Sequence, residues 1–219
     1  MPELPEVETT VRGLRAVLEG QRLDEVTPRR ADLRRAIPAD LRQRLTGATV
    51  TGLGRRAKYG LIDTDRGDTL IFHLGMSGRW RVDPEDIGTH DHLVIRTGAG
   101  RTPALNDPRR FGSLDILATD SMMDFAAFRT LGPEPLGPEL TTAYLAEALA
   151  GRSAPIKALL LDQRIVAGLG NIYVCEALNI AGIAPARAGG LITRPRLARL
   201  VAAIRDVLAA AIEAGGSTL

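Results

Sequence analysis

Residues 132–140 read GPEPLGPEL and decide the fold. Prolines and glycines at this density interrupt helices and strands, so the segment predicts a connection between two domains. Before it, short apolar runs alternate with turn signals, which is typical of antiparallel β-structure. After it, apolar residues recur at helical spacing. The sequence therefore predicts an α+β protein, with a β-rich N-terminal domain at residues 1–131 and a helical domain at residues 132–219.

The N-terminal half is expected to contain one helix followed by strands. Residues 3–18 carry apolar side chains at helical spacing, and Gly20 follows just past their end. Short β-like runs come next, separated by turn signals, at residues 48–54, 60–64, 69–74, 79–82, 92–97 and 113–117. This succession predicts antiparallel sheets that form a sandwich or a barrel.

The second half is expected to be helical throughout. Its periodic segments predict helices at residues 142–150, 154–161 and 194–214, with a glycine-punctuated stretch between the last two. The chain then stops at residues 215–219, GGSTL, which is typical of an unfinished connection.

Composition narrows the class of protein. Hydrophobic residues make up 45% of the 219 positions and charged residues 25%, as in ordinary globular proteins. The acidic N-terminus is unlike a secretory signal, and no apolar run approaches the roughly 20 residues of a membrane span, so we expect a cytoplasmic protein. Cys175 is the only cysteine, which excludes an internal disulfide and any cysteine-pair zinc motif.

The first residues carry a candidate nucleophile. Removal of Met1 would leave Pro2 with a secondary amine that is less basic than a lysine side chain and more often neutral near pH 7. Such an amine can attack the anomeric carbon of a sugar, and Glu3 places a carboxyl beside it as a general acid or base. The alternative is structural: Pro2 and Pro5 start a helix whose dipole is complemented by Glu3, Glu6 and Glu8.

Two predicted turns of the N-terminal half carry side chains suited to DNA. Lys58, one of only two lysines, lies in RRAKYG at residues 55–60, where a turn can present cations to phosphate; a solvated basic turn is the alternative. Met76 lies between glycines in HLGMSG at residues 73–78. An exposed methionine there fits a wedge that fills the gap left by an extruded base, whereas a core methionine under a loop is equally compatible.

The loop NDPRRFG at residues 106–112 combines Arg109 with Phe111. A guanidinium can replace the hydrogen bonds that an orphaned base has lost, and an aromatic ring can stack into the duplex. Upstream, His90 and His92 lack the further ligands that a metal site needs. We expect His90 to contact phosphate or to pack on a strand.

The helical half offers polar groups ahead of a helix. The glycines of GLGNIY at residues 168–173 allow backbone N–H groups to face an anion, and Asn171 is expected to cap the helix and donate to phosphate. Lys157 and Arg152 lie upstream, on what we expect to be a neighbouring surface. A capped helix pair without a ligand is the alternative.

Taken together, the chain resembles the formamidopyrimidine-DNA glycosylases and, more distantly, the endonuclease VIII glycosylases. The motifs that carry the resemblance are, in order, MPELPEVET, RRAKYG, HLGMSG, NDPRRFG, LGPEPLG and GLGNIYVCEAL. The resemblance implies a β-sandwich with flanking helices, a helical domain with a helix-two-turn-helix element, and double-stranded damaged DNA bound between them. It further implies excision of oxidised purines such as 8-oxoguanine and formamidopyrimidines. We expect a monomer.

The resemblance also implies roles for individual residues. Pro2 would attack the sugar of the flipped nucleotide and form a Schiff base, Glu3 would assist ring opening, and Lys58 would contact phosphate and aid the chemistry. The base would leave, and β- then δ-elimination would nick the strand. The implied base-stack wedge and DNA contacts comprise Met76, Arg109 and Phe111 in the vacated stack, and His90, Arg109, Arg152, Lys157 and Asn171 on the DNA.

One departure from the family concerns the end of the chain. Family members usually continue into a lesion-capping loop and a four-cysteine zinc finger, which these 219 residues do not contain, so no zinc or other cofactor is expected here. The main alternative function is a non-catalytic paralogue that binds damaged or abasic DNA. An unrelated sandwich protein with an RNA partner would explain the arginines but not Met76, Arg109 and Phe111.

Overall fold

The structure is a computed structural model that describes residues 2–216. The expectations for removal of Met1 and for the last three residues therefore lie outside the described part of the chain. Contacts between Cα atoms divide the chain into two compact units. We call Met1–Pro2 with Val7–Phe125 the sandwich unit, and Glu3–Glu6 with Ala126–Leu219 the helical unit.

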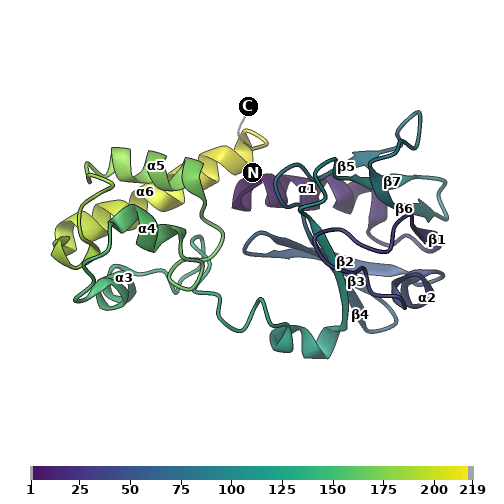
Figure 1. Cartoon of the computed structure of the whole chain (residues 1–219), viewed down its shortest axis with the longest axis horizontal. Helices are drawn as coiled ribbons and strands as arrows, with labels where there is room; N and C mark the ends of the chain where they lie inside the picture. Colours follow the sequence, from purple (N-terminus) through teal and green to yellow (C-terminus); the bar gives the residue numbers. More distant parts are fainter. Residues whose placement is uncertain (1, 217–219) are drawn as a thin grey trace. The chain divides into compact units, whose positions relative to one another are not determined.

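Two antiparallel sheets form the sandwich unit (Figure 1), which confirms the predicted α+β class. Their strands are β1 (Leu23–Pro28), β2 (Val50–Arg56), β3 (Tyr59–Thr64), β4 (Asp68–His73), β5 (Arg79–Val82), β6 (Asp91–Thr97), β7 (Pro103–Asn106) and β8 (Ser113–Ala118). One sheet has the strand order β1-β6-β7-β5 and the other β2-β3-β4-β8. The predicted runs match six of these strands, whereas β1 and β7 were not predicted.

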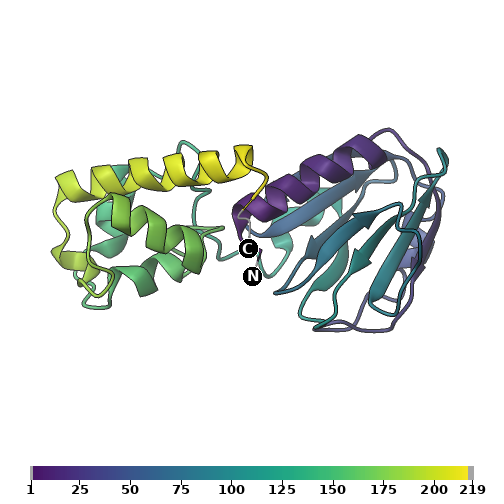
Figure 2. The same ribbon diagram turned by 90° about the horizontal axis from the view of Figure 1, so that it is seen from above.

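Helix α1 (Leu4–Leu18) lies alongside the sheets (Figure 2). Val7, Val11 and Leu14 recur at helical spacing on its buried face, as the sequence predicts. They share one hydrophobic core with inward-facing strand residues such as Phe72 and Ile95. Burial of this stripe is the main force that holds the helix on the sandwich.

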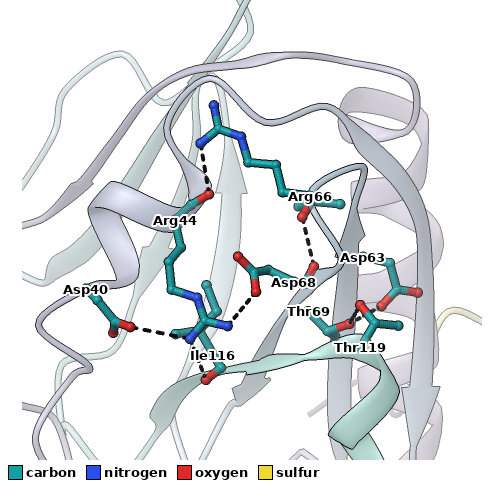
Figure 3. Close-up of polar contacts among 9 residues, drawn as sticks. Asp40, Arg44, Asp63, Arg66, Asp68, Thr69, Ile116 and Thr119 are labelled. Atoms are coloured by element: carbon teal, nitrogen blue, oxygen red, sulfur yellow. Dashed lines mark hydrogen bonds and ion pairs between the residues drawn. The ribbon is translucent and has the colours of Figure 1, made fainter.

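A polar cluster fastens helix α2 (Leu41–Leu45) to one end of β4 (Figure 3). Arg44 Nη2 lies 2.5 Å from Asp68 Oδ1, and Arg44 Nη1 donates to the carbonyl of Ile116 at 3.4 Å. The hydrogen bond with Asp68 raises the pKa of Arg44. Because Asp68 begins β4 and His73 ends it, this cluster lies at the end of β4 opposite the turn that carries Met76.

The helical unit packs around its own core. Its helices are α3 (Thr142–Leu149), α4 (Ile156–Leu161), α5 (Asn171–Ile180) and α6 (Arg194–Glu213). Helix α5 packs against both α4 and α6, and Leu4 at the start of α1 is buried in this core. Among residues 2–216, no helix combines the length and the apolar character needed to cross a membrane.

Candidate active site and nucleic-acid interface

The carboxylate of Glu3 is fixed at the start of α5. Glu3 is 2% exposed, and its Oε1 accepts a hydrogen bond from the backbone N–H of Ile172 at 3.0 Å. A helix N-terminus favours a negative charge, so the first turn of α5 stabilises this carboxylate. The approach is close, because a Cβ at Gly170 would lie 2.3 Å from Cδ of Glu3. The anion that the glycine segment faces is thus the side chain of Glu3.

Glu6 holds the backbone of the same segment. Its Oε2 accepts from the N–H of Glu3 at 2.8 Å, and its Oε1 accepts from the Tyr173 hydroxyl at 2.5 Å. The N–H of Leu4 donates to the carbonyl of Gly168 at 3.1 Å. This role of Glu6 was not predicted, although the spacing from Glu3 to Glu6 is that of a capping box. Pro2, which is half-buried, is therefore joined to a firmly anchored neighbour.

Gln163 organises the loop that leads into α5. Its Oε1 accepts from the N–H of Gly168 at 2.9 Å, and its Nε2 donates to the carbonyl of Leu169 at 2.8 Å. One amide side chain thereby fixes two backbone groups just ahead of Gly170. Gln163 was not predicted from the sequence, because a single amide in a loop matches no motif.

Among the polar residues predicted for the helical half, Asn171 does not take the expected capping position. Asn171 does not cap α5: Gly170 is the N-cap, and Asn171 is the first helical residue, exposed to solvent. Its exposure leaves the amide accessible to a phosphate. Arg152 is exposed and donates to the carbonyl of Ala148 at 2.9 Å, and Lys157 is half-buried in the first turn of α4.

Lys58 lies in the two-residue turn between β2 and β3, after Ala57, whose φ is 52°. Lys58 is only 8% exposed. Its neighbour Arg55 is turned toward Glu8, with Nε 3.3 Å from Oε2, and donates to the carbonyl of Ala57 at 2.7 Å. The alternative of a solvated basic turn is therefore wrong for Lys58 and Arg55.

His73 supports the turn that follows β4. Burial, together with the positive charges of Lys58, Arg34 and Arg35, lowers the pKa of His73 from 6.5 to about 4. The imidazole is thus neutral near pH 7, and its Nδ1 accepts from the N–H of Gly75 at 3.0 Å. This hydrogen bond requires an unprotonated Nδ1.

Acidification is expected to destabilise the sandwich unit through His73. Above about pH 6.5 the imidazole is neutral in both states; as the pH falls toward about 4, only the unfolded chain binds the proton, so stability is lost across this window. The loss is roughly 3 kcal/mol by pH 4. Urea unfolding, followed by the fluorescence of Trp80 in β5, measures it.

The control for this prediction is His73→Asn, which retains an acceptor but does not titrate. Between pH 7.5 and 4.5, we expect the variant to lose roughly 2 to 3 kcal/mol less than the wild type. Equal losses in both proteins would show that His73 does not sense pH.

Met76, Arg109 and Phe111 project from neighbouring loops. Met76 is 43% exposed and Phe111 44%, so the alternative of a core methionine is wrong. The guanidinium carbon of Arg109 lies 4.7 Å from the centroid of the Phe111 ring, which is a cation–π geometry. The sandwich unit therefore presents two exposed apolar side chains and one cation together.

His90 and His92 differ in their surroundings. His90 is exposed, and its carbonyl accepts from the N–H of Asp107 at 2.9 Å. His92 is buried, with Nε2 2.9 Å from the carbonyl oxygen of Asp107. Strand packing thus describes His92, while the imidazole of His90 is accessible to a ligand. Within residues 2–216, no group of three or more His, Cys, Asp and Glu side chains is placed to hold a metal ion.

Comparison with known proteins identifies the family. The model of the formamidopyrimidine-DNA glycosylase N-terminal domain matches residues 1–114, and that of the formamidopyrimidine-DNA glycosylase H2TH domain matches residues 131–219. The chain belongs to the formamidopyrimidine-DNA glycosylase family. The predicted resemblance is confirmed, and the protein is a member of a family of DNA glycosylases.

Relatives named formamidopyrimidine-DNA glycosylase align with the whole chain. The formamidopyrimidine-DNA glycosylase of Rhizorhabdus wittichii is 72% identical over 219 residues, covering 100% of this chain and 81% of the relative. The formamidopyrimidine-DNA glycosylase of Zymomonas mobilis is 52% identical with the same coverage. The family resemblance implies zinc held by four cysteines; because Cys175 is the only cysteine of the 219 residues, they cannot supply that site.

Solved structures of the family share the fold. A formamidopyrimidine-DNA glycosylase from Lactococcus lactis, noncovalently bound to DNA that contains an AP site, has a TM-score of 0.91 and 33% identity, covering 99% of this chain and 83% of its own. The MutM (Fpg) protein from Thermus thermophilus has a TM-score of 0.88 and 40% identity, covering 100% of this chain and 79% of its own.

Proposed function

We propose that this family member is a bifunctional DNA glycosylase and AP lyase that excises oxidised purines, with the amine of Pro2 as its nucleophile. The observation that carries the proposal is the fixed carboxylate of Glu3, held 3.0 Å from the N–H of Ile172 and one residue from Pro2. A buried, anchored carboxylate next to a terminal amine can exchange protons with the substrate sugar that the amine attacks.

The proposed reaction begins at the sugar of the damaged nucleotide. The nitrogen of Pro2 forms a bond to C1′ and the glycosidic bond breaks, so that the base departs and takes a proton from water. The carboxylate of Glu3 accepts the proton that the attacking Pro2 nitrogen loses and passes it to the ring oxygen, so the sugar opens and an iminium forms with Pro2. Loss of a proton from C2′ then expels the 3′ phosphate, and loss of a further proton expels the 5′ phosphate. Lys58 is the proposed phosphate contact that aids these steps.

The proposed partner is double-stranded damaged DNA. Solved relatives that bind an AP-site DNA and an N7-benzyl-Fapy-dG DNA support it. Exposed Met76 and Phe111, with Arg109, would fill the stack that an extruded nucleotide vacates. The proposed phosphate and base contacts are His90, Arg109, Arg152, Lys157 and Asn171. We further propose that the protein acts as a cytoplasmic monomer and that the Pro2 chemistry requires no cofactor.

Borohydride trapping on wild-type protein tests the proposal. Protein shown by intact mass to lack Met1 is incubated with duplex DNA that contains 8-oxoguanine, an abasic site or no lesion, and borohydride reduces any iminium to a stable amine. We expect covalent adducts with both damaged duplexes, and tryptic mass spectrometry should place the cross-link in the peptide of residues 2–12. Undamaged DNA is the control.

The other outcomes separate the competing functions. An adduct with abasic DNA alone would support the proposed lyase activity and contradict the proposed base excision. Binding without an adduct on either damaged duplex would establish the non-catalytic DNA-binding paralogue instead. A cross-link at Lys58 or Lys157 would assign the nucleophile to a different amine.

A further inference from the structure

Two loops of the sandwich unit cross between its sheets side by side. Residues 74–78 lead from β4 to β5, and residues 107–112 lead from β7 to β8. The strand residues that flank the two loops pair with each other: His73 is opposite Ser113 at one end, and Arg79 is opposite Asn106 at the other. The topology therefore holds the loop of Met76 next to the loop of Arg109 and Phe111.

The side chain of Asp107 ties these two loops together. Asp107 is fully buried; its Oδ1 accepts from the Ser77 hydroxyl at 2.6 Å and its Oδ2 accepts from the N–H of Gly112 at 2.8 Å. The Ser77 oxygen in turn accepts from the N–H of Arg109 at 3.2 Å. A single carboxylate thus links the residue after Met76 with both ends of the loop that carries Arg109 and Phe111.

The backbone of Asp107 extends the connection to the loop of His90. Its N–H donates to the carbonyl of His90 at 2.9 Å, and its own carbonyl lies 2.9 Å from Nε2 of His92. The carbonyl also accepts from the N–H of Arg110 at 3.2 Å, where φ is 58°. Each polar atom of Asp107 therefore has a partner, as a buried carboxyl group requires.

The backbones of the two loops approach each other so closely that only glycine fits at two positions. Gly75 has φ of 61°, and a Cβ there would lie 2.3 Å from the carbonyl carbon of Phe111. A Cβ at Gly112 would lie 2.7 Å from the carbonyl oxygen of His73. No side chain fits between the loop backbones at Gly75 or Gly112. The loops are therefore joined there by backbone contact and by the hydrogen bonds of Asp107 and Ser77.

We infer that Asp107 is a positioning residue that makes the two loops one rigid element and presents Met76, Arg109 and Phe111 to DNA in a fixed arrangement. The inference rests on the proposed wedge function of these three side chains. A preformed wedge loses little conformational freedom when it enters the stack, whereas two independent loops would have to be ordered on binding. Asp107 itself need not touch the DNA.

Asp107→Asn tests the inference, because it keeps the shape of the side chain while replacing one acceptor oxygen with a donor amide. An amide nitrogen that faces the N–H of Gly112 would set two donors against each other. If it faces Ser77 instead, that hydrogen bond is reversed, and the Ser77 hydroxyl, which already accepts from Arg109, accepts twice and loses its own acceptor. Either placement loses a hydrogen bond that the carboxylate of Asp107 accepts. The probe is borohydride trapping at an abasic site, in duplex DNA and in the same strand without its complement.

The measured quantity is the ratio of the duplex rate to the single-strand rate. A single strand has no paired stack to fill and no orphaned base, so only the duplex rate depends on the wedge. We expect the ratio to fall at least about tenfold in Asp107→Asn, and to fall by a smaller factor in Ser77→Ala. Combined with Met76→Ala, Asp107→Asn should lower the ratio by less than the product of the separate factors.

Arg44→Leu is the stability control, since it breaks the ion pair with Asp68 at the opposite end of β4 and leaves the two loops intact. It should lower the melting temperature without changing the ratio. An unchanged ratio in folded Asp107→Asn, or a wild-type ratio near one, would overturn the inference. Failure of the wild type to form any adduct with either DNA would instead overturn the proposed function.

Discussion

Replacement of Glu3 by glutamine is expected to lower the rate of 8-oxoguanine excision by roughly 10²- to 10⁴-fold, the range for loss of a general acid or base. Glutamine preserves the acceptor oxygen for the N–H of Ile172, so the segment should stay in place. It cannot exchange a proton with the substrate. Single-turnover excision from duplex DNA measures the effect.

The same variant provides an internal control. An abasic sugar is already partly an open aldehyde, so the proposed attack by the amine of Pro2 would need less assistance there. We expect Glu3→Gln to trap abasic DNA far more efficiently than it excises 8-oxoguanine. Equal loss on both substrates would indicate a general defect in binding, and no loss on either would remove Glu3 from the mechanism.

Gly170→Ala is expected to reduce excision roughly 10²-fold without altering any reacting group, because displacement of a catalytic group by about 1 Å can have that effect. The added Cβ would lie 2.3 Å from Cδ and 2.4 Å from Oε1 of Glu3, so the carboxylate must move. The φ of Gly170 is −135°, which alanine adopts readily. The effect therefore arises from the clash and not from backbone strain.

The matched control is Gly13→Ala, a substitution of the same kind within α1 where no heavy atom lies within 4 Å of the new Cβ. It should keep wild-type excision and, as alanine favours helix, stabilise the protein by about 0.5 to 1 kcal/mol. The double variant of Gly170→Ala with Glu3→Gln should excise no more slowly than Glu3→Gln alone. Wild-type excision by folded Gly170→Ala would show that the close approach to Glu3 has no catalytic consequence.

Six of the eight strands within residues 2–216 could be predicted from the sequence, including β4, which has four consecutive buried residues and no alternation. β5 was predicted at its observed bounds, because turn signals precede and follow it. β7 was not predicted, because it is short and its first residue is proline, which is unfavourable within a strand. β1 escaped because a register shift between Leu23 and Glu25 breaks the alternation.

The exposed residues of the candidate site could be predicted from the sequence, whereas the residues that hold them in place could be predicted only in part. Exposed Met76 between glycines is a pattern that sequence shows directly. The interactions of Asp107 and Gln163 depend on loops brought together by the fold, and no local pattern reveals such partners. Asn171 was assigned as a cap because asparagine favours that position, but Gly170 takes it and permits the approach of Glu3.

The first residues of the chain acquire two of their partners late in protein synthesis. Glu3 and Glu6 bond to Ile172 and Tyr173, which are separated from them by 169 and 167 positions. At the rate of roughly 5 to 20 residues per second, the ribosome needs on the order of ten seconds or more to reach them. Until then, the carboxylate beside the Pro2 amine has no anchor in α5. A nascent chain that stalls before residue 171 would therefore carry Glu3 beside Pro2 without the backbone N–H that anchors its carboxylate.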